Sequence, residues 1–337
     1  MKSRFSIIVP LALAWLTQGA IAAVAPYPDM PEIAPIGVRT SYLPVPESAR
    51  GPAVDPAKGY RIEELGKGLY LVTDNQIQSM FLVYETGVVV MDAPQAYAAK
   101  IRTAIREVTD KPVTHLIYSH SHADHIGGAK TLGVPPIIIA QEETKRLLVR
   151  DQDPERPVPT ITFKDRYDLK VGSQILELSY HGDGHEPGNT FIYMPRQKTL
   201  MVIDLVFPGW IMWRRLAVAH EPVQVFEQVN LIRTLPFEKI VGGHVARWGT
   251  HADVELEWAF LQDLKATAKT ALATTKPGEG LDPSAQGNPW AYFDDYIDRV
   301  VVQCVNKMTP KWKDKLGGFD AFIWDQCLSM EQSLRLD

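Results

Sequence analysis

Hydrophobic positions follow different patterns in different parts of the chain. From Tyr60 onwards they form short apolar runs separated by turn residues, which is typical of β-strands. The runs GLYLVTD, SMFLVYETG and VVVMDAP predict three strands, and a tight turn at residues 85–87 joins the second to the third. A helical spacing follows over residues 95–109, and then a further apolar strand, PVTHLIYSH. Strands and helices therefore alternate, as they do in α/β proteins.

The alternation continues to about residue 250. The elements predicted in this part are the strand PPIIIA, a helix over residues 141–150, a strand pair around the turn at 170–173, the strands FIYMP and TLMVID, the helix EPVQVFEQVNLIRTLP and the strand EKIVGGH. We expect an αββα sandwich, in which two mixed β-sheets pack face to face and helices cover their outer faces.

The two ends of the chain depart from this pattern. Residues 23–58 are rich in Pro, Ala and Gly and have no sustained periodicity, so we expect an extended N-terminal arm. From Ala252 the spacing is helical, with one turn-rich interruption at KPGEGLDPSAQGNP. The expected organisation is a leader at 1–22, the arm, a main domain at 59–251 and a C-terminal helical extension at 252–337.

The leader has the pattern of a signal peptide. Two basic residues, Lys2 and Arg4, precede an apolar run over residues 7–16, and small residues stand before an expected cleavage after Ala22. The apolar run is too short to cross the roughly 30 Å hydrocarbon core of a bilayer as a helix, so no stable membrane anchor is expected. The sequence predicts a periplasmic or secreted protein.

Charge and cysteine content narrow the functional classes. The formal net charge is −5, it becomes −7 without Lys2 and Arg4, and no basic cluster is present, so nucleic acid is not an expected partner. Cys304 and Cys327 both lie on predicted helices. Because an exported protein meets an oxidising compartment, we predict a disulfide between them, with two buried free thiols as the alternative.

One loop carries four potential metal ligands within six positions. The segment 119–128, SHSHADHIGG, follows an apolar strand and contains His120, His122, Asp124 and His125. A loop at the end of a strand can direct such side chains to one point, and imidazole and carboxylate groups are suitable zinc ligands. A polar surface loop is the alternative, but this pattern rarely arises by chance between a buried strand and two glycines. The sequence therefore predicts a metal centre.

This loop resembles that of the metallo-β-lactamase superfamily, in which it supplies ligands to both metals of a two-metal site. The segment YHGDGHEPGN is similar to the family's second ligand turn, with His185 in the ligand position. Asn189 stands where an asparagine of the zinc β-lactamases helps to polarise a substrate carbonyl. Asp204, at the end of TLMVID, matches the acid that bridges the metals, and His244, in IVGGHV, matches the last histidine.

The resemblance covers about residues 60–250 and implies the metallo-β-lactamase fold with two metal ions. Zinc is the expected metal, and iron and manganese accept the same ligand types. Asp92, at the end of VVVMDAP, matches a residue that supports the metal loop from behind. The implied ligands are His120, His122 and His185 for one metal, Asp124, His125 and His244 for the other, and Asp204 for both. The other histidines, His115, His181, His220 and His251, are expected to be core, surface or outer-shell residues.

A metal-bridging hydroxide is the implied nucleophile, because three imidazoles leave a position for water that a second metal can share. We expect a dizinc hydrolase that cleaves a lactone, ester or related acyl bond of a small molecule, with Asp124 orienting the water and moving a proton to the leaving group. The alternatives are β-lactam hydrolysis, phosphate or sulfate ester hydrolysis at the same site, and a mononuclear iron oxidoreductase like the persulfide dioxygenases. A non-catalytic binding protein is disfavoured because no ligand is missing.

Two aromatic stretches, FPGWIMWRR and ARWG, directly follow Asp204 and His244. Their rings are predicted to line an apolar substrate pocket or, alternatively, to pack the helical extension onto the core. The rings concerned are Phe207, Trp210, Trp213 and Trp248. Arg214 and Arg215 are expected to meet an anionic group or to be solvated. The C-terminal helices are expected to cap the pocket or to form the face of a homodimer.

Overall fold

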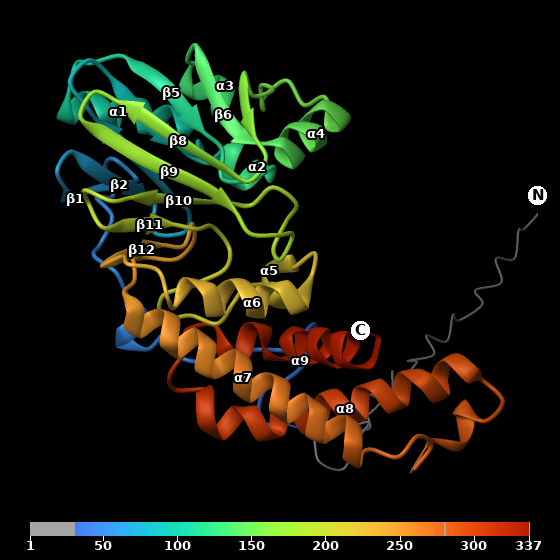
Figure 1. Cartoon of the computed structure of the whole chain (residues 1–337). Helices are drawn as coiled ribbons and strands as arrows, with labels where there is room; N and C mark the ends of the chain where they lie inside the picture. Colours follow the sequence, from blue (N-terminus) through green and yellow to red (C-terminus); the bar gives the residue numbers. More distant parts are fainter. Residues whose placement is uncertain (1–30, 280, 337) are drawn as a thin grey trace, which may run out of the picture.

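The computed structural model of the chain describes residues 31–279 and 281–336. The predicted leader at 1–22 and the arm as far as residue 30 lie outside the described residues. Figure 1 shows the strands in the upper part of the molecule and the long C-terminal helices below them. Among the described residues, no helix has both the length and the hydropathy needed to cross a bilayer.

The first sheet has seven strands, which lie side by side in the order of the sequence. They are β1 (Arg61–Gly66), β2 (Leu69–Thr73), β3 (Gln78–Val83), β4 (Val88–Met91), β5 (Val113–Ile117), β6 (Ile137–Gln141) and β7 (Ile161–Phe163). Strands β1 to β4 pair antiparallel through short turns, and β4 to β7 pair parallel. Parallel neighbours need a longer crossover, which the helix α1 (Ala98–Val108) supplies between β4 and β5.

The second sheet has five strands in the order β12-β11-β10-β9-β8. They are β8 (Arg166–Val171), β9 (Gln174–Tyr180), β10 (Thr190–Met194), β11 (Thr199–Met201) and β12 (Lys239–Val241). Only β11 and β12 pair parallel, so this sheet is also mixed.

The two sheets pack face to face, and β4 shows why. Side chains of a strand alternate between its two faces. Val89 and Met91 accordingly join the core between the sheets, whereas Val88 and Val90 join a second core with Ile101 of α1. The other α-helices are α2 (Ala123–Ile126), α3 (Ala129–Leu132), α4 (Glu142–Asp151), α5 (Arg214–Val218), α6 (Pro222–Ile232), α7 (His251–Thr274), α8 (Pro289–Trp312) and α9 (Phe319–Leu336). The predicted αββα sandwich with a C-terminal helical part is confirmed.

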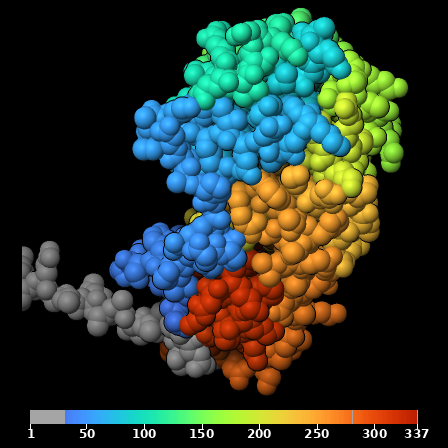
Figure 2. All heavy atoms as spheres, turned by 90° about the vertical axis from the view of Figure 1, so that its left-hand side faces the viewer, coloured from blue at the N-terminus to red at the C-terminus, as the bar shows by residue number. Residues whose placement is uncertain are grey.

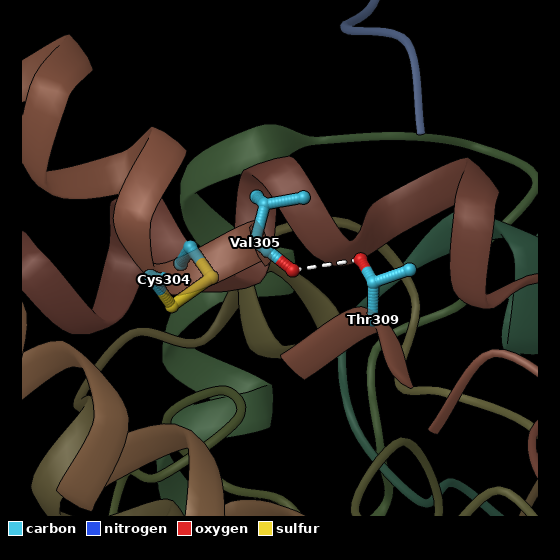
Figure 3. The surroundings of a disulfide bond; sticks show 4 residues. Cys304, Val305 and Thr309 are labelled. Atoms are coloured by element: carbon cyan, nitrogen blue, oxygen red, sulfur yellow. Dashed lines mark hydrogen bonds between the residues drawn. A yellow bond between two sulfur atoms is a disulfide. The ribbon is translucent and has the colours of Figure 1, made fainter. Parts of the chain in front are cut away.

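The C-terminal helices form a third core with the outer face of the second sheet. Helices α6 to α9 contribute to one apolar cluster together with Phe191 and Leu200 of that sheet. A disulfide between Cys304 of α8 and Cys327 of α9 lies within this cluster, as predicted. Figure 3 shows it next to Thr309, whose hydroxyl donates a hydrogen bond to the carbonyl of Val305 at 2.7 Å.

The described part of the arm runs along the C-terminal helices. Ile33 is buried in the cluster that α9 helps to form, and its carbonyl accepts a hydrogen bond from the Trp324 indole at 2.8 Å. The Leu43 amide donates to Asp320 of α9 at 2.8 Å. Figure 2 shows the arm, in blue, against the red surface of α9. Residues from the two ends of the described chain therefore pack together.

Two local features differ from the sequence-based expectation. The strand β11 ends at Met201, so Asp204 lies beyond the strand end, with a left-handed φ of 63°. Its amide donates to the Gly242 carbonyl at 3.0 Å, which holds it beside β12. The segment after it contains α5, in which residues 215–218 all have φ near +55°. This left-handed turn was not predicted, because side chains with a Cβ disfavour that region.

Candidate metal centre

The loop after β5 is held from behind by Asp92. This side chain is fully buried, and its Oδ1 accepts a hydrogen bond from the Ser119 amide at 2.8 Å. Burial raises the pKa of Asp92 to about 6, although nearby His125 and the Ser119 hydrogen bond oppose the shift. The parallel strands β4 and β5 thus place Asp92 directly under the start of the histidine loop.

Three histidines and Asp204 form the first group of donors. The Nε2 atom of His185 lies 3.4 Å from Nε2 of His120 and 3.2 Å from Nδ1 of His122. It also lies 3.1 Å from Oδ2 of Asp204. Each of the four residues offers one donor atom within 4.8 Å of the others.

Asp124, His125 and His244 form the second group under the same limit. The Nε2 atoms of His125 and His244 are 3.0 Å apart, and each lies 3.5 Å from Oδ2 of Asp124. Asp204 reaches this group as well, because its Oδ1 lies 3.1 Å from Nε2 of His244 and its Oδ2 lies 3.3 Å from Nε2 of His125. The carboxylate of Asp204 is therefore shared between the two groups.

The electrostatics of the cluster follow from burial and from opposite charges at short range. Burial would raise the pKa of Asp204, but the imidazoles of His125, His244 and His185 hold it well below its usual range. Burial would lower the pKa of His244, but the carboxylates of Asp204 and Asp124 raise it to about 10. Burial and the neighbouring imidazoles lower the pKa of His120 well below its usual value. Protons thus compete for the positions that a cation would take.

Oxygen atoms around the cluster orient the imidazole rings. The Ser119 hydroxyl lies 2.9 Å from Nδ1 of His120, and the Gln76 carbonyl lies 3.2 Å from Nδ1 of His244. Both contacts leave Nε2 directed at the cluster. Glu186 Oε2 lies 3.4 Å from Nε2 of His122, so that ring faces the cluster through Nδ1. Sequence reasoning missed Gln76 and Glu186. The only available signal was the carboxylate next to His185 in YHGDGHEPGN.

The donor set fits a pair of metal ions. Five imidazoles and two carboxylates converge on this site. The Nε2 atoms of His125 and His244 lie within hydrogen-bonding distance of each other, and a proton bound to one of them can join only this pair, whereas a metal ion can bind several such donors at once. Nitrogen and carboxylate donors of this kind suit zinc, with iron and manganese as further possibilities. The structure therefore brings together all seven residues that the sequence singled out as ligands.

Two other predicted site residues, Phe207 and Asn189, lie near the donor cluster and are buried. Phe207 is buried and lies parallel to the ring of His244, with 6.0 Å between the ring centroids, so it borders the cluster. Asn189 is fully buried, and its side-chain amide donates to the Ile203 carbonyl at 2.9 Å. One of its two N–H groups thus holds the segment that leads to Asp204, and the side chain has no exposed surface, so the structure shows a positioning contact for Asn189.

The three tryptophans have separate environments. The Trp210 indole donates to the Ala49 carbonyl, and its ring lies against Gly317 ahead of α9, so it packs the arm and the helical part onto the core. The Trp248 indole donates to Glu63 of β1. Trp213 is 49% exposed. The alternative of structural packing thus fits Trp210 and Trp248 better than a pocket wall does.

Comparison with known proteins agrees with the fold and the donor cluster. The family model described as the metallo-beta-lactamase superfamily matches residues 72–244, just over half of the chain. The chain belongs to this superfamily and is one of its metal-dependent hydrolases. The matched range ends at His244 and contains all seven donors.

Two curated relatives differ in how much of the chain they match. The 2,4-dinitroanisole O-demethylase subunit alpha of Nocardioides sp. (strain JS1661) is 27% identical over 276 residues, which cover 72% of this chain and 78% of that protein. The metallo-beta-lactamase type 2 of Elizabethkingia meningoseptica is 28% identical over 155 residues, which cover 42% of this chain and 60% of that protein.

Solved structures show the same fold. A metallo-beta-lactamase from Pontibacter korlensis has a TM-score of 0.53 at 20% identity, and the match covers 60% of this chain and 99% of that one. The metallo-beta-lactamase IND-7 has a TM-score of 0.51 at 22% identity, with 60% and 98% covered. These β-lactamases are matched over nearly their whole length, while a large part of this chain has no counterpart in them.

Proposed function

We propose that the chain is an exported dizinc hydrolase that cleaves an ester, lactone or related acyl bond of a small molecule. The observation that carries the proposal is the carboxylate of Asp204, which lies 3.1 Å from His185 of one donor group and 3.1 Å from His244 of the other. In this proposal His120, His122 and His185 would hold one metal, and Asp124, His125 and His244 would hold the other. Asp204 would be a ligand of both.

Two metal ions held there would lower the pKa of water and polarise the group under attack. The chain's own residues define the side from which a substrate approaches. Four of the seven donor side chains are at most 6% exposed, namely His120, His125, His185 and Asp204. The other three are more open: Asp124 is 49% exposed, His122 is 36% exposed and His244 is 24% exposed. The open side of the cluster is therefore formed by these three residues.

Asp124 is the residue we propose to orient water and to carry a proton. It is the most exposed of the seven donors. Burial opposes ionisation, but a hydrogen bond with His244 and the charge of His125 keep the pKa of Asp124 below its usual value. An ionised carboxylate at the open side can accept a proton from water and pass it to a leaving group.

Export is supported by the disulfide, since such bonds persist in oxidising compartments. The sequence of the leader supports the same proposal. Periplasmic and secreted locations both satisfy these two observations.

Cleavage of an aryl methyl ether is the second candidate. The demethylase subunit matches 72% of this chain, which is more than the superfamily model covers, so the likeness reaches beyond the metal-binding core. Hydroxide can also attack an aromatic carbon that electron-withdrawing groups activate, with loss of methoxide.

β-Lactam hydrolysis is a weaker candidate, because buried Phe207 occupies the position of a lysine that often binds the lactam carboxylate.

The test is a substrate survey with the zinc-loaded, mature protein. Proton release in weak buffer is followed with lactones, carboxyl esters, thioesters, β-lactams, and phosphate and sulfate esters. Release of 2,4-dinitrophenolate from 2,4-dinitroanisole is followed by its colour. We expect turnover of one acyl class. Metal content is measured separately on the protein purified without added zinc, and one iron per chain there, with no zinc-dependent turnover in the survey, would favour the oxidoreductase alternative.

The matched control is Asp204→Asn, which keeps the size of the side chain and removes its charge. We expect the variant to bind fewer than two zinc ions and to lose at least about 100-fold in kcat, because the shared carboxylate no longer links the two donor groups. Turnover that is equal in the variant and the wild type would contradict dizinc catalysis. Turnover of 2,4-dinitroanisole alone would replace the acyl proposal by the ether proposal.

A further inference from the structure

Two adjacent arginines after Asp204 have different surroundings. The Nε atom of Arg214 lies 3.3 Å from Oδ2 of Asp325, and its guanidinium lies over the ring of Phe322. The guanidinium of Arg215 makes no hydrogen bond or ion pair with any residue in the ranges 31–279 and 281–336. The positive charge of Arg214 is thus neutralised by Asp325, whereas that of Arg215 is available to a ligand.

Arg215 lines a small cavity between the left-handed turn, the start of α6 and the C-terminal half of α9. The cavity has a volume of about 190 Å³, and its polar lining consists of Arg215, His220, Ser329, Gln332 and Ser333. No carboxylate lines it. The carboxylate of Glu221, which is not part of the lining, lies 3.9 Å from Nδ1 of His220. Ser329 is only 7% exposed, and its hydroxyl makes no side-chain hydrogen bond to another described residue. The lining therefore offers hydrogen-bond donors and a positive charge, and it contains no negatively charged side chain to neutralise that charge.

The backbone that presents Arg215 is strained and held in place. Residues 215–218 all lie in the left-handed region, which is unfavourable for every residue that carries a Cβ. Gln326 of α9 is fully buried and fixes the turn: its Nε2 donates to the carbonyls of Met212 and Trp213, and its Oε1 accepts from the Leu216 amide. Strain that the surrounding structure maintains in this way is common at ligand-binding sites.

The cavity is joined to the metal centre through two backbone hydrogen bonds. The His220 amide donates to the carbonyl of His185 at 2.9 Å, and the Glu221 amide donates to that of Gly184 at 3.0 Å. His220, which lines the cavity, is therefore next to the turn that carries a proposed metal ligand. The wall of the cavity and the turn that carries His185 are therefore connected through the backbone.

We propose that this cavity binds an oxyanion, such as a carboxylate, phosphate or sulfate group. Arg215 supplies the permanent charge, and the hydroxyls of Ser329 and Ser333 with the amide of Gln332 supply neutral donors. A volume of about 190 Å³ accommodates such a group but not a large molecule. The inference does not depend on which bond the metal centre cleaves.

The test uses zinc-loaded full-length protein labelled with ¹⁵N-arginine and titrated with sodium sulfate. We expect the Arg215 Nε–H signal to move along a saturating curve, while the Arg214 signal, which is paired with Asp325, stays in place. Sodium chloride at matched ionic strength controls for screening. Arg215→Gln is expected to weaken sulfate binding at least about 10-fold, the loss of one charge-assisted contact, whereas the neighbouring Arg214→Gln changes it by less than about twofold.

Two further variants keep the proposal falsifiable. Ser329→Ala removes a cavity hydroxyl without touching the charge and is expected to weaken sulfate binding several-fold. Asp204→Asn disturbs the metal centre and is expected to leave the Arg215 response intact. The proposal is overturned if the response disappears in Asp204→Asn, since sulfate would then be binding at the metals, or if Arg214→Gln and Arg215→Gln have equal effects.

The source of the oxyanion is assigned by kinetics. A pair of substrates that differ only in one carboxylate is compared in the wild type and in Arg215→Gln. A rise in KM for the acidic substrate alone shows that the oxyanion belongs to the substrate. An unchanged KM ratio, together with an effect of sulfate on both substrates that Arg215→Gln abolishes, shows that a free anion occupies the site.

Discussion

Glu186 contacts His122 on the side of the ring that faces away from the metal cluster. Its Oε2 lies 3.4 Å from Nε2 of His122, and its Oε1 accepts a hydrogen bond from the Ser121 hydroxyl at 2.9 Å. Burial opposes ionisation of Glu186, but these contacts keep its pKa below the usual value. A carboxylate in this place fixes the ring orientation and makes the imidazole a stronger donor.

Replacement of Glu186 by Gln should therefore weaken metal binding more than it affects folding. We expect the affinity for one of the two zinc ions to fall by about 10–100-fold, because the charge behind His122 is lost while the shape is kept. Competition with a chromogenic chelator measures the affinity, and the visible spectrum of the cobalt-substituted protein reports the ligand environment. Ser121→Ala, which leaves the carboxylate in place, is the control. Equal zinc affinity in Glu186→Gln and wild type would contradict this role.

The raised pKa of His244 predicts how zinc binding depends on pH. In the metal-free protein, Asp204 and Asp124 overcome the effect of burial and raise this pKa to about 10, so His244 is protonated at neutral pH. Zinc must displace that proton. The apparent zinc affinity should therefore rise with pH, by up to about tenfold per unit for each proton released, and level off above pH 10.

Chelator competition between pH 6.5 and pH 8.5 measures this dependence, and proton release on zinc addition gives the number of protons displaced. His244→Gln, which cannot carry the proton, should show a smaller slope. An affinity that stays constant over this range in the wild type would show that His244 is already neutral in the metal-free protein.

At the scale of single elements, the C-terminal helices depend on a covalent link. Cys304 and Cys327 are fully buried and join α8 to α9 across 23 residues of sequence. Helix α9 in turn holds the left-handed turn of α5 through Gln326. The disulfide therefore stabilises the helix that presents one wall of the cavity beside the metal centre.

The double variant Cys304→Ala with Cys327→Ala should be less stable by about 3 kcal/mol, because a loop of this length is no longer restricted in the unfolded chain. Urea denaturation measures the difference. Zinc stoichiometry should not change, since none of the seven donors lies on α8 or α9. Dithiothreitol should destabilise the wild type by a similar amount and leave the variant unaffected. A difference below about 1 kcal/mol would indicate that helix packing alone holds α8 and α9 together.

At the scale of the whole molecule, the arm connects the helical part to the sheets. Its residues bond to α9 through Ile33 and Leu43, and further along the carbonyl of Ala49 accepts from Trp210 after Asp204. In Figure 2 the arm passes from the sheets onto α9. The arm is thus part of the folded structure, although its sequence has no regular pattern.

A chain that keeps its leader but lacks residues 23–50 should retain the metal cluster and lose stability in the helical part. Removal of Ile33 opens the core at α9, so we expect amide exchange in α9 to accelerate by at least about tenfold. Hydrogen–deuterium exchange measures this by region, and Trp324→Phe, which removes the hydrogen bond to Ile33 but keeps Ile33 and an aromatic ring in place, should give a smaller change. Unchanged exchange in α9 would show that the arm merely lies on the surface.

The sequence predicted most strands and helices in their order, but not β1 and β7, and it predicted the seven candidate ligands with the help of the family resemblance. The strands, the helices and the four ligands of the loop at 119–128 were predicted from local patterns, which do not depend on the rest of the chain. The resemblance to a known family supplied His185, Asp204 and His244. The disulfide was also predictable, because only two cysteines exist and both lie on C-terminal helices. Asp204 lies in the donor cluster, as predicted, although strand β11, which was predicted to end at Asp204, ends three residues earlier at Met201.

Only the tertiary structure decided which residues surround those ligands. Glu186 turns towards His122, Asn189 is buried against Ile203, and Trp210 bonds to the arm, all through contacts between segments that no local pattern relates. The left-handed turn at 215–218 is disfavoured by its own residues and exists because buried Gln326, more than 100 positions away, satisfies its backbone. Local sequence encodes local preference, whereas such long-range contacts form only when the whole chain has folded.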